Sequence, residues 1–186
     1  AKDIIYTGLK RMEYRGYDSA GIVVVDKKLH TAKAVGDTSK LDINSLPETA
    51  TMGIGHTRWA THGEPSTRNA HPHTFGDITL VHNGIIENYL ELKKSIDASK
   101  LLSETDSEVL AGVINAFYQQ SHDLLEAVKS ALALVKGTFG IAVLARDTKD
   151  TIITARRGSP ILVGVGDKQN YIASDPSAII DHTDKV

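Results

Sequence analysis

The spacing of apolar residues changes along the chain, and each change marks an expected element. Apolar positions at helical spacing predict a helix over residues 1–16. A β-branched run predicts a strand over 19–26, which ends in a turn-prone Asp-Lys-Lys and returns as a hairpin over 30–35. Residues 36–49 mix Asp, Asn, Ser and Pro and indicate a loop. Two more strands are expected, over residues 51–59 and 77–84.

Helices are expected in the middle of the chain, over residues 85–96, 103–120 and 123–137. The second begins with a capping signature, in which Thr105 is followed three residues later by Glu108. The third would end at Gly137. Strands with short turns follow and predict an antiparallel sheet, over 138–147, 151–157, 161–166 and 170–174. Strands at both ends with helices between them indicate an α+β architecture with helices layered on sheets.

Composition narrows the class of protein. A chain of 186 residues with 41% hydrophobic and 24% charged residues is typical of one folded domain. A net charge of −2 and the lack of a Lys/Arg block argue against nucleic acid as a partner. The longest aliphatic run, Ile22 to Val25, is far too short for a membrane span, and no signal peptide pattern opens the chain. Without cysteine there is no disulfide framework, so we expect a cytoplasmic protein.

The segment 55–65 is too polar for a core strand and too rich in aromatic and basic groups for an idle loop. Arg58 carries a planar guanidinium that binds a carboxylate through two parallel hydrogen bonds, which lysine cannot copy. Trp59 fits a wall over a ligand, and as the only Trp it fits a core anchor equally well. An isolated arginine more often forms a surface ion pair, but Thr61 and His62 nearby favour ligand binding.

A second charged candidate is Asp106, in the sequence ETDSE. Taken alone, it fits a first-turn acid that the helix dipole favours, but a carboxylate there also suits a substrate ammonium. Arginine for a carboxylate and aspartate for an ammonium form the minimal recognition set for a free amino acid.

Asn83 and Gly84, in the sequence HNG, form a third candidate. Asn-Gly is normally a tight hairpin turn, but the segment that follows is expected to be helical, which a two-residue hairpin does not suit. The Asn amide and the Gly N–H both donate hydrogen bonds, so together they suit an oxyanion hole.

Five of the eight histidines lie between His56 and His82, and such a cluster raises the question of zinc. Catalytic zinc sites use three protein ligands at workable spacing, often with a carboxylate. The nearest acids, Glu64 and Asp77, show no such pattern. We therefore expect hydrogen-bonded structural histidines, with neither a metal nor a cofactor.

Seven motifs run in order along the chain: EYRGYDSAG, GHTRWATHGEPS, NAHPH, HNGIIEN, SETDSEV, RRGSPILVGVG and YIASDPSAI. They closely resemble the glutaminase domain of the glutamine–fructose-6-phosphate aminotransferase family, and the resemblance covers nearly the whole chain. The TRWATHG form favours the sugar enzymes over the related amidotransferases of purine synthesis. The resemblance implies an N-terminal-nucleophile hydrolase fold, a four-layer αββα sandwich with antiparallel sheets.

The resemblance also implies an activity, the hydrolysis of glutamine to glutamate and ammonia. Arg58 would hold the α-carboxylate of glutamine and Asp106 its α-ammonium. Ammonia would pass to a C-terminal sugar isomerase domain of the same polypeptide, which makes glucosamine 6-phosphate, and the full enzyme would be a homodimer. 

Roles for other residues follow from the same resemblance. Trp59, Thr61 and His62 would belong to the loop that closes over glutamine. Asn83 and Gly84 would form the oxyanion hole, and Arg15 would lie near the nucleophile.

The nucleophile itself raises a difficulty. In the family it is a cysteine at the mature N-terminus, whose own α-amine serves as the base. This sequence has no cysteine, and residues 1–16 match the family's first helix, so we expect that the preceding strand of about ten residues is missing. The alternatives are a glutamine-binding module of the same fold without hydrolysis, and the glutaminase half of a purine-pathway amidotransferase.

Overall fold

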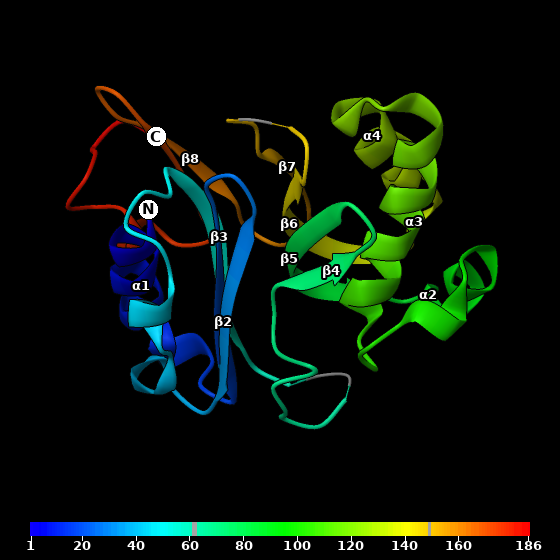
Figure 1. Cartoon of the computed structure of the whole chain (residues 1–186), viewed down its shortest axis with the longest axis horizontal. Coiled ribbons are helices and arrows are strands. Elements are labelled where there is room, and N and C mark those ends of the chain that lie inside the picture. Colours follow the sequence, from blue (N-terminus) through cyan, green and yellow to red (C-terminus); the bar gives the residue numbers. More distant parts are fainter. Residues whose placement is uncertain (61–62, 149) are drawn as a thin grey trace.

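The computed structural model describes residues 1–60, 63–148 and 150–186. The chain forms four layers, in which two antiparallel sheets face each other and helices cover their outer sides (Figure 1). No helix within these three ranges is both long enough and apolar enough to cross a membrane.

The first sheet contains the N-terminal strands β1 (Ser19–Val25), β2 (Leu29–Val35) and β3 (Met52–Arg58). Strand β1 lies at the centre and pairs antiparallel with both neighbours, which agrees with its buried β-branched run. Helix α1 (Lys2–Arg11) covers the outer face of this sheet. It approaches closely because Gly55 has no side chain: a Cβ there would lie 2.5 Å from Ile5.

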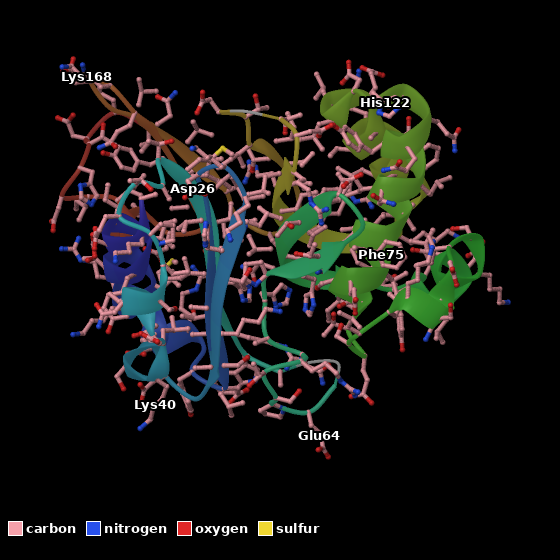
Figure 2. All side chains as sticks on the ribbon, viewed as in Figure 1. Asp26, Lys40, Glu64, Phe75, His122 and Lys168 are labelled. Carbon is pink, nitrogen blue, oxygen red and sulfur yellow. The ribbon has the colours of Figure 1, made fainter. Side chains whose placement is uncertain are left out.

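The second sheet contains antiparallel strands in the order β4 (His73–Phe75), β5 (Ile78–Ile86), β6 (Gly137–Ala145) and β7 (Ile153–Arg157). Its outer face is covered by α3 (Asp106–Ser121) and α4 (Leu124–Leu134). The sheet and these helices enclose a large buried apolar cluster, to which Phe75 contributes from β4 (Figure 2).

Apolar side chains also fill the space between the two sheets. Val23 and Ile54 come from the first sheet, and Ala142 and Leu144 come from the second. Two sheets packed face to face between helical layers confirm the expected α+β, four-layer αββα architecture.

The C-terminal strands depart from the expected single sheet. Strands β6 and β7 pair as predicted, but β8 (Leu162–Val165) and β9 (Asn170–Ala173) form a separate two-stranded sheet. The reason is packing: Tyr171 and its buried neighbours lie against Ile4 and Met12, in and beside α1. The apolar side of this hairpin is therefore covered by the first helix.

The prediction of a helix over residues 85–96 is wrong for most of that segment. Ile86 ends β5, where it is fully buried and pairs with Gly137. Only α2 (Tyr89–Leu92) is helical, and a 3₁₀ turn follows it. Pairing with β6 outweighs the amphipathic pattern of the segment. The 3₁₀ turns in the described part of the chain are Glu13–Arg15, Thr38–Lys40, Ile43–Ser45, Lys93–Ser95, Ala98–Lys100 and Pro176–Ala178.

The other two helices start close to the predicted positions. The Thr105 side chain accepts a hydrogen bond from the Glu108 N–H, as the capping signature predicts. Helix α4 ends at Leu134, earlier than expected, because Val135 is already extended. Gly137 is not the end of this helix. It opens β6 with a φ of 117°, a conformation that favours glycine.

Candidate active site

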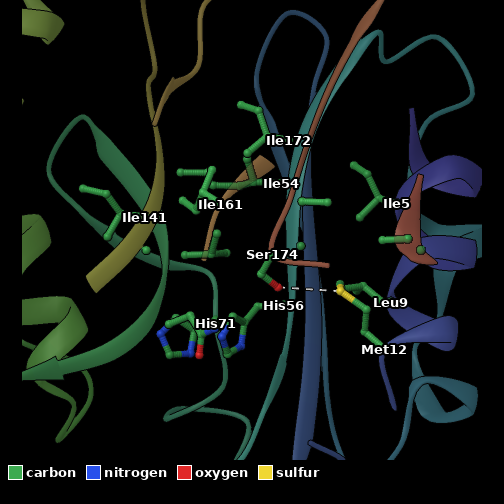
Figure 3. A pocket seen from close by; sticks show the side chains of 18 of the residues that line it. Ile5, Leu9, Met12, Ile54, His56, His71, Ile141, Ile161, Ile172 and Ser174 are labelled. Atoms are coloured by element: carbon green, nitrogen blue, oxygen red, sulfur yellow. Dashed lines mark hydrogen bonds between the residues drawn. The ribbon is translucent and has the colours of Figure 1, made fainter. Parts of the chain in front are cut away.

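A cavity of about 840 Å³ lies between β3 and the second sheet and extends to β9. Isoleucine side chains from several elements surround one part of it, and His56 and His71 lie at the other end (Figure 3). All the described candidate residues line it: Arg15, Arg58, Trp59, Asn83, Gly84 and Asp106. The remaining candidates, Thr61 and His62, lie outside the described residues.

Arg58 is the last residue of β3, and its side chain is buried, with 4% of the residue exposed. Its backbone is held by the residue before β1, because the Asp18 N–H donates to the Arg58 carbonyl at 3.0 Å. One terminal nitrogen donates to the Gly63 carbonyl at 3.0 Å. Burial lowers the pKa of Arg58, whereas the carboxylates of Asp18 and Asp106 act to raise it. The guanidinium remains a cation in this setting.

Trp59 follows directly and is 59% exposed, so its interpretation as a core anchor is wrong. Its ring lies 5.7 Å from the Tyr17 ring at an interplanar angle of 73°. The next residue is fixed by a carboxylate, since Ala60 N–H donates to Asp18 Oδ2 at 2.8 Å. Trp59 therefore stands at the rim of the cavity on an anchored backbone, as the interpretation of a wall over a ligand requires.

Asp106 is the first residue of α3 and is 4% exposed. Its Oδ2 accepts a hydrogen bond from the Ile86 N–H at 2.8 Å, and its Oδ1 lies 3.4 Å from the Ser107 hydroxyl. The positive end of the helix dipole stabilises a carboxylate at this position. The helix start and β5 together hold a buried negative charge in the cavity that contains the Arg58 cation.

Asn83 and Gly84 lie inside β5, so the Asn-Gly pair is not a hairpin turn, as predicted. The reason given for that prediction is wrong, because the strand continues through Ile86 where a helix was expected. Gly84 has a φ of 141°, and a Cβ there would lie 2.2 Å from the Thr138 carbonyl oxygen. Only glycine fits this close approach of two strands.

Arg15 reaches the cavity from the 3₁₀ turn after α1. Its Nη1 donates to the Ser174 carbonyl at 3.3 Å and lies 3.6 Å from Asp175 Oδ2. The Tyr14 hydroxyl donates to the same carboxylate oxygen at 2.9 Å. The segment after β9 thus fixes the position of a second cation at the cavity.

The buried histidines are hydrogen-bonded, as predicted. His71 Nε2 and His82 Nδ1 lie 3.0 Å and 2.9 Å from the Ser107 hydroxyl, and His73 Nε2 lies 3.1 Å from the Thr105 hydroxyl. Burial lowers the pKa of His71 and His73 well below the usual value, and neighbouring histidines act in the same direction. Within residues 1–60, 63–148 and 150–186, no group of three or more His, Cys, Asp or Glu could hold a metal ion.

The sequence interpretation missed two residues at this site. Ser107 links His71 and His82 in the lining of the cavity, and Asp18 anchors the backbone beside Trp59. Both lie inside motifs that were recognised, but their partners are 25 to 42 residues away. A short polar side chain gives no local signal of such a distant partner.

Comparisons with known proteins agree with this geometry. The profile of the glutamine amidotransferase domain family matches residues 56–181. Glutamine–fructose-6-phosphate aminotransferases [isomerizing] from Chlorobaculum tepidum and Bacillus subtilis are 47% and 46% identical to this chain over its full length. The chain spans about a third of their length, 32% in each case.

A solved structure shares the fold. Glutamine phosphoribosylpyrophosphate amidotransferase from B. subtilis has a TM-score of 0.81 and 27% identity, and the match covers 98% of this chain and 42% of that one. The expected N-terminal-nucleophile architecture is thereby confirmed. With more than half of its residues matched by one family profile, the chain belongs to the glutamine amidotransferase domain family.

Proposed function

We propose that this chain is the glutaminase part of a glutamine–fructose-6-phosphate aminotransferase. It would hydrolyse glutamine to glutamate and ammonia, and the rest of the polypeptide would use the ammonia to convert fructose 6-phosphate to glucosamine 6-phosphate. Relatives with this name are 47% and 46% identical to the chain, against 27% for the purine-pathway structure. This difference supports the sugar enzyme over the purine-pathway alternative.

One observation carries the proposal: a buried cation, Arg58, and a buried anion, Asp106, line the same cavity. Glutamine carries a carboxylate and an ammonium on one carbon, and each charge must lose water on entering the protein. A buried charge without an opposite partner is costly. In the proposal Arg58 holds the α-carboxylate and Asp106 the α-ammonium.

The amide end of glutamine would lie at β5. Asn83 and the Gly84 N–H would donate to the carbonyl oxygen as it gains negative charge, which lowers the barrier to attack. Trp59, with Thr61 and His62 in the same loop, would cover the bound amino acid. These roles rest on the family resemblance and on the position of the described residues around the cavity.

The nucleophile would be a cysteine at the start of a segment that precedes Ala1. Its thiol would attack the amide carbon, its α-amine would carry the thiol proton to the departing ammonia, and water would then hydrolyse the thioester. The Ala1 amino group donates to the carbonyl of Ala50, which precedes β3, at 3.0 Å. A strand along β3 needs about 3.3 Å per residue, so seven residues and a turn would lead from Ala1 to Arg58.

The remaining partners belong to the same proposal. The C-terminal sugar isomerase domain would lie on the same polypeptide, and the full enzyme would be a homodimer, which light scattering of the full polypeptide tests. A phosphorylated sugar is charged and does not cross membranes unaided, so the proposal places the enzyme in the cytoplasm.

The proposal is tested in the full polypeptide by glutamine hydrolysis and by calorimetric titration with L-glutamate. The product carries the same α-carboxylate and α-ammonium and is not consumed. Arg58→Ala and Asp106→Asn should each weaken binding by about 2–4 kcal/mol, because each leaves a buried charge unpaired. Arg58→Lys should rescue little, since a point charge cannot form the bidentate contact.

Asp123→Asn is the matched control, because Asp123 also stands at a helix start, as the N-cap of α4, but is exposed. It should leave binding unchanged. Wild-type affinity in Arg58→Ala or Asp106→Asn would remove that residue from the site. A protein from its own gene with an intact mass of 20.1 kDa and no hydrolysis would leave only the glutamine-binding module.

A further inference from the structure

Two contacts tie β5 to the start of α3, and they flank Asn83 and Gly84. On one side the His82 ring lies 2.9 Å from the Ser107 hydroxyl. On the other side the Ile86 N–H donates to Asp106 Oδ2 at 2.8 Å. The candidate oxyanion hole therefore lies between two links to the helix that carries the candidate ammonium-binding carboxylate.

The protons of the first link can be assigned from the donors and acceptors. His82 Nε2 lies 3.4 Å from the Thr138 carbonyl, which can only accept, so Nε2 carries the proton in the neutral ring. His82 Nδ1 is then an acceptor at 2.9 Å from the Ser107 hydroxyl, and it receives the single proton in preference to Asp106 Oδ1, which lies farther away at 3.4 Å. The Ser107 oxygen in turn accepts from His71, whose Nε2 lies 3.0 Å away.

The result is a directed chain of hydrogen bonds, from His71 through Ser107 and His82 to Thr138. Its three side chains are all buried. It ends on the carbonyl that closely approaches Gly84, where a Cβ would lie 2.2 Å from the Thr138 oxygen. These hydrogen bonds thus fix the position of β5 relative to both α3 and β6 at Gly84.

Neutral histidines are required for this direction of protons. Burial lowers the pKa of His71, and the nearby Arg58 cation acts in the same direction. A protonated His71 would have two donors, and among the described residues its Nδ1 has no acceptor. The neutral ring leaves only a bare nitrogen there, which costs less than a buried unpaired N–H.

We propose that Ser107 is a positioning residue that holds the oxyanion hole at Asn83 and Gly84 in register with Asp106. It does so by bridging His71 and His82, and its effect on the reaction passes through these two rings. The catalytic part of this inference rests on the proposed glutaminase function, whereas the proton assignment does not depend on it.

The first test replaces the hydroxyl in the full polypeptide and measures glutamine hydrolysis. Ser107→Ala should lower kcat by about 10-fold or more, because a small displacement of the oxyanion hole is enough for such a loss. Ser107→Thr keeps the hydroxyl, and its kcat should stay within about threefold of the wild-type value. KM should change less than kcat in Ser107→Ala, since Asp106 keeps its bond from the Ile86 N–H.

Thr79→Val is the matched control. Thr79 is fully buried on the same strand, and its hydroxyl bonds the Thr74 hydroxyl at 2.8 Å. Its loss should lower the melting temperature without lowering kcat, because neither residue lines the cavity. A kcat for Ser107→Ala no lower than that of Thr79→Val would overturn the positioning role.

The second test reads the proton positions directly, by ¹⁵N NMR of the histidine rings in the unsubstituted protein. In both His71 and His82, Nε2 should carry the proton and Nδ1 should be unprotonated. A proton on His82 Nδ1 would overturn the chain to Thr138, whether or not the protein hydrolyses glutamine. This measurement also decides the matter if Ser107→Ala fails to fold, and an inactive wild type with the expected tautomers would count against the proposed function alone.

Discussion

Acid should unfold this protein through its buried histidines, and His56 allows the effect to be worked out. Burial lowers the pKa of His56 from 6.5 to about 3, and the nearby cations Arg58 and Arg15 also oppose protonation. The His71 ring lies 4.3 Å away and is held neutral by the same burial. No carboxylate is among the groups that act on the pKa of His56 in the described part of the chain.

The sign follows from linkage. A histidine that is neutral when folded binds a proton more readily when unfolded, so its contribution is complete above the unfolded pKa and is lost as the pH falls below 6.5. With a folded value of about 3, the loss between pH 7 and pH 5 is about 2 kcal/mol for His56 alone. His71 and His73 act in the same direction. Typical domains have only about 5–15 kcal/mol of stability, so the protein should be close to unfolding at pH 5.

Urea denaturation followed by far-UV circular dichroism at pH 7 and pH 5 measures the effect. In His56→Gln, which keeps a donor for the His82 backbone, the loss of unfolding free energy between the two pH values should be about 2 kcal/mol smaller. His122→Asn is the control, because His122 is exposed and has a φ of 51° that Asn accepts. The same pH dependence in His56→Gln and wild type would refute the reasoning.

Three further changes test the packing around the site. Gly84→Ala should cost at least about 3 kcal/mol in urea denaturation, because a positive φ and a 2.2 Å approach to Thr138 both oppose a side chain; a loss below about 1 kcal/mol would contradict this. Thr105→Ala removes the cap that accepts from the Glu108 N–H and should lower unfolding free energy by about 1–2 kcal/mol, with thermal denaturation as the measurement. Lys33→Met should raise stability at pH 7 and lose that advantage as the pH rises from 8 towards 10.5, since burial lowers the pKa of Lys33 to about 8. If urea denaturation gave Lys33→Met the same gain in stability at pH 8 and at pH 10.5, the gain would not come from removing the Lys33 charge.

The elements that the sequence predicts best are those decided by local interactions. The strand at Ser19–Val25 follows from a run of β-branched residues, and the start of α3 follows from a cap between Thr105 and Glu108. Segments decided by distant partners were predicted wrongly. Ile86 has the apolar spacing of a helix but ends a strand, because Gly137 pairs with it from fifty-one positions later in the chain.

The same division holds at the candidate site. Arg58, Asp106, Asn83 and Gly84 were recognised by their chemistry and by motif resemblance, and the fold brings them to one cavity. Ser107 also bonds two residues of the cavity lining, His71 and His82. In the sequence it cannot be told from any other polar residue of a helix, because these partners are brought to it only by the fold. Positioning residues are for this reason the part of a site that composition and spacing describe least.

The neutral histidines also bear on which molecules the cavity accepts. A zwitterionic α-carbon needs one cation and one anion, and Arg58 and Asp106 provide them in the lining of one cavity. His56 and His71 line the same cavity, and two imidazolium charges there would leave it strongly positive and suited to anions in general. Burial keeps both rings neutral at physiological pH by lowering the pKa of each. The same desolvation that makes the fold sensitive to acid therefore preserves the charge balance that a free amino acid requires.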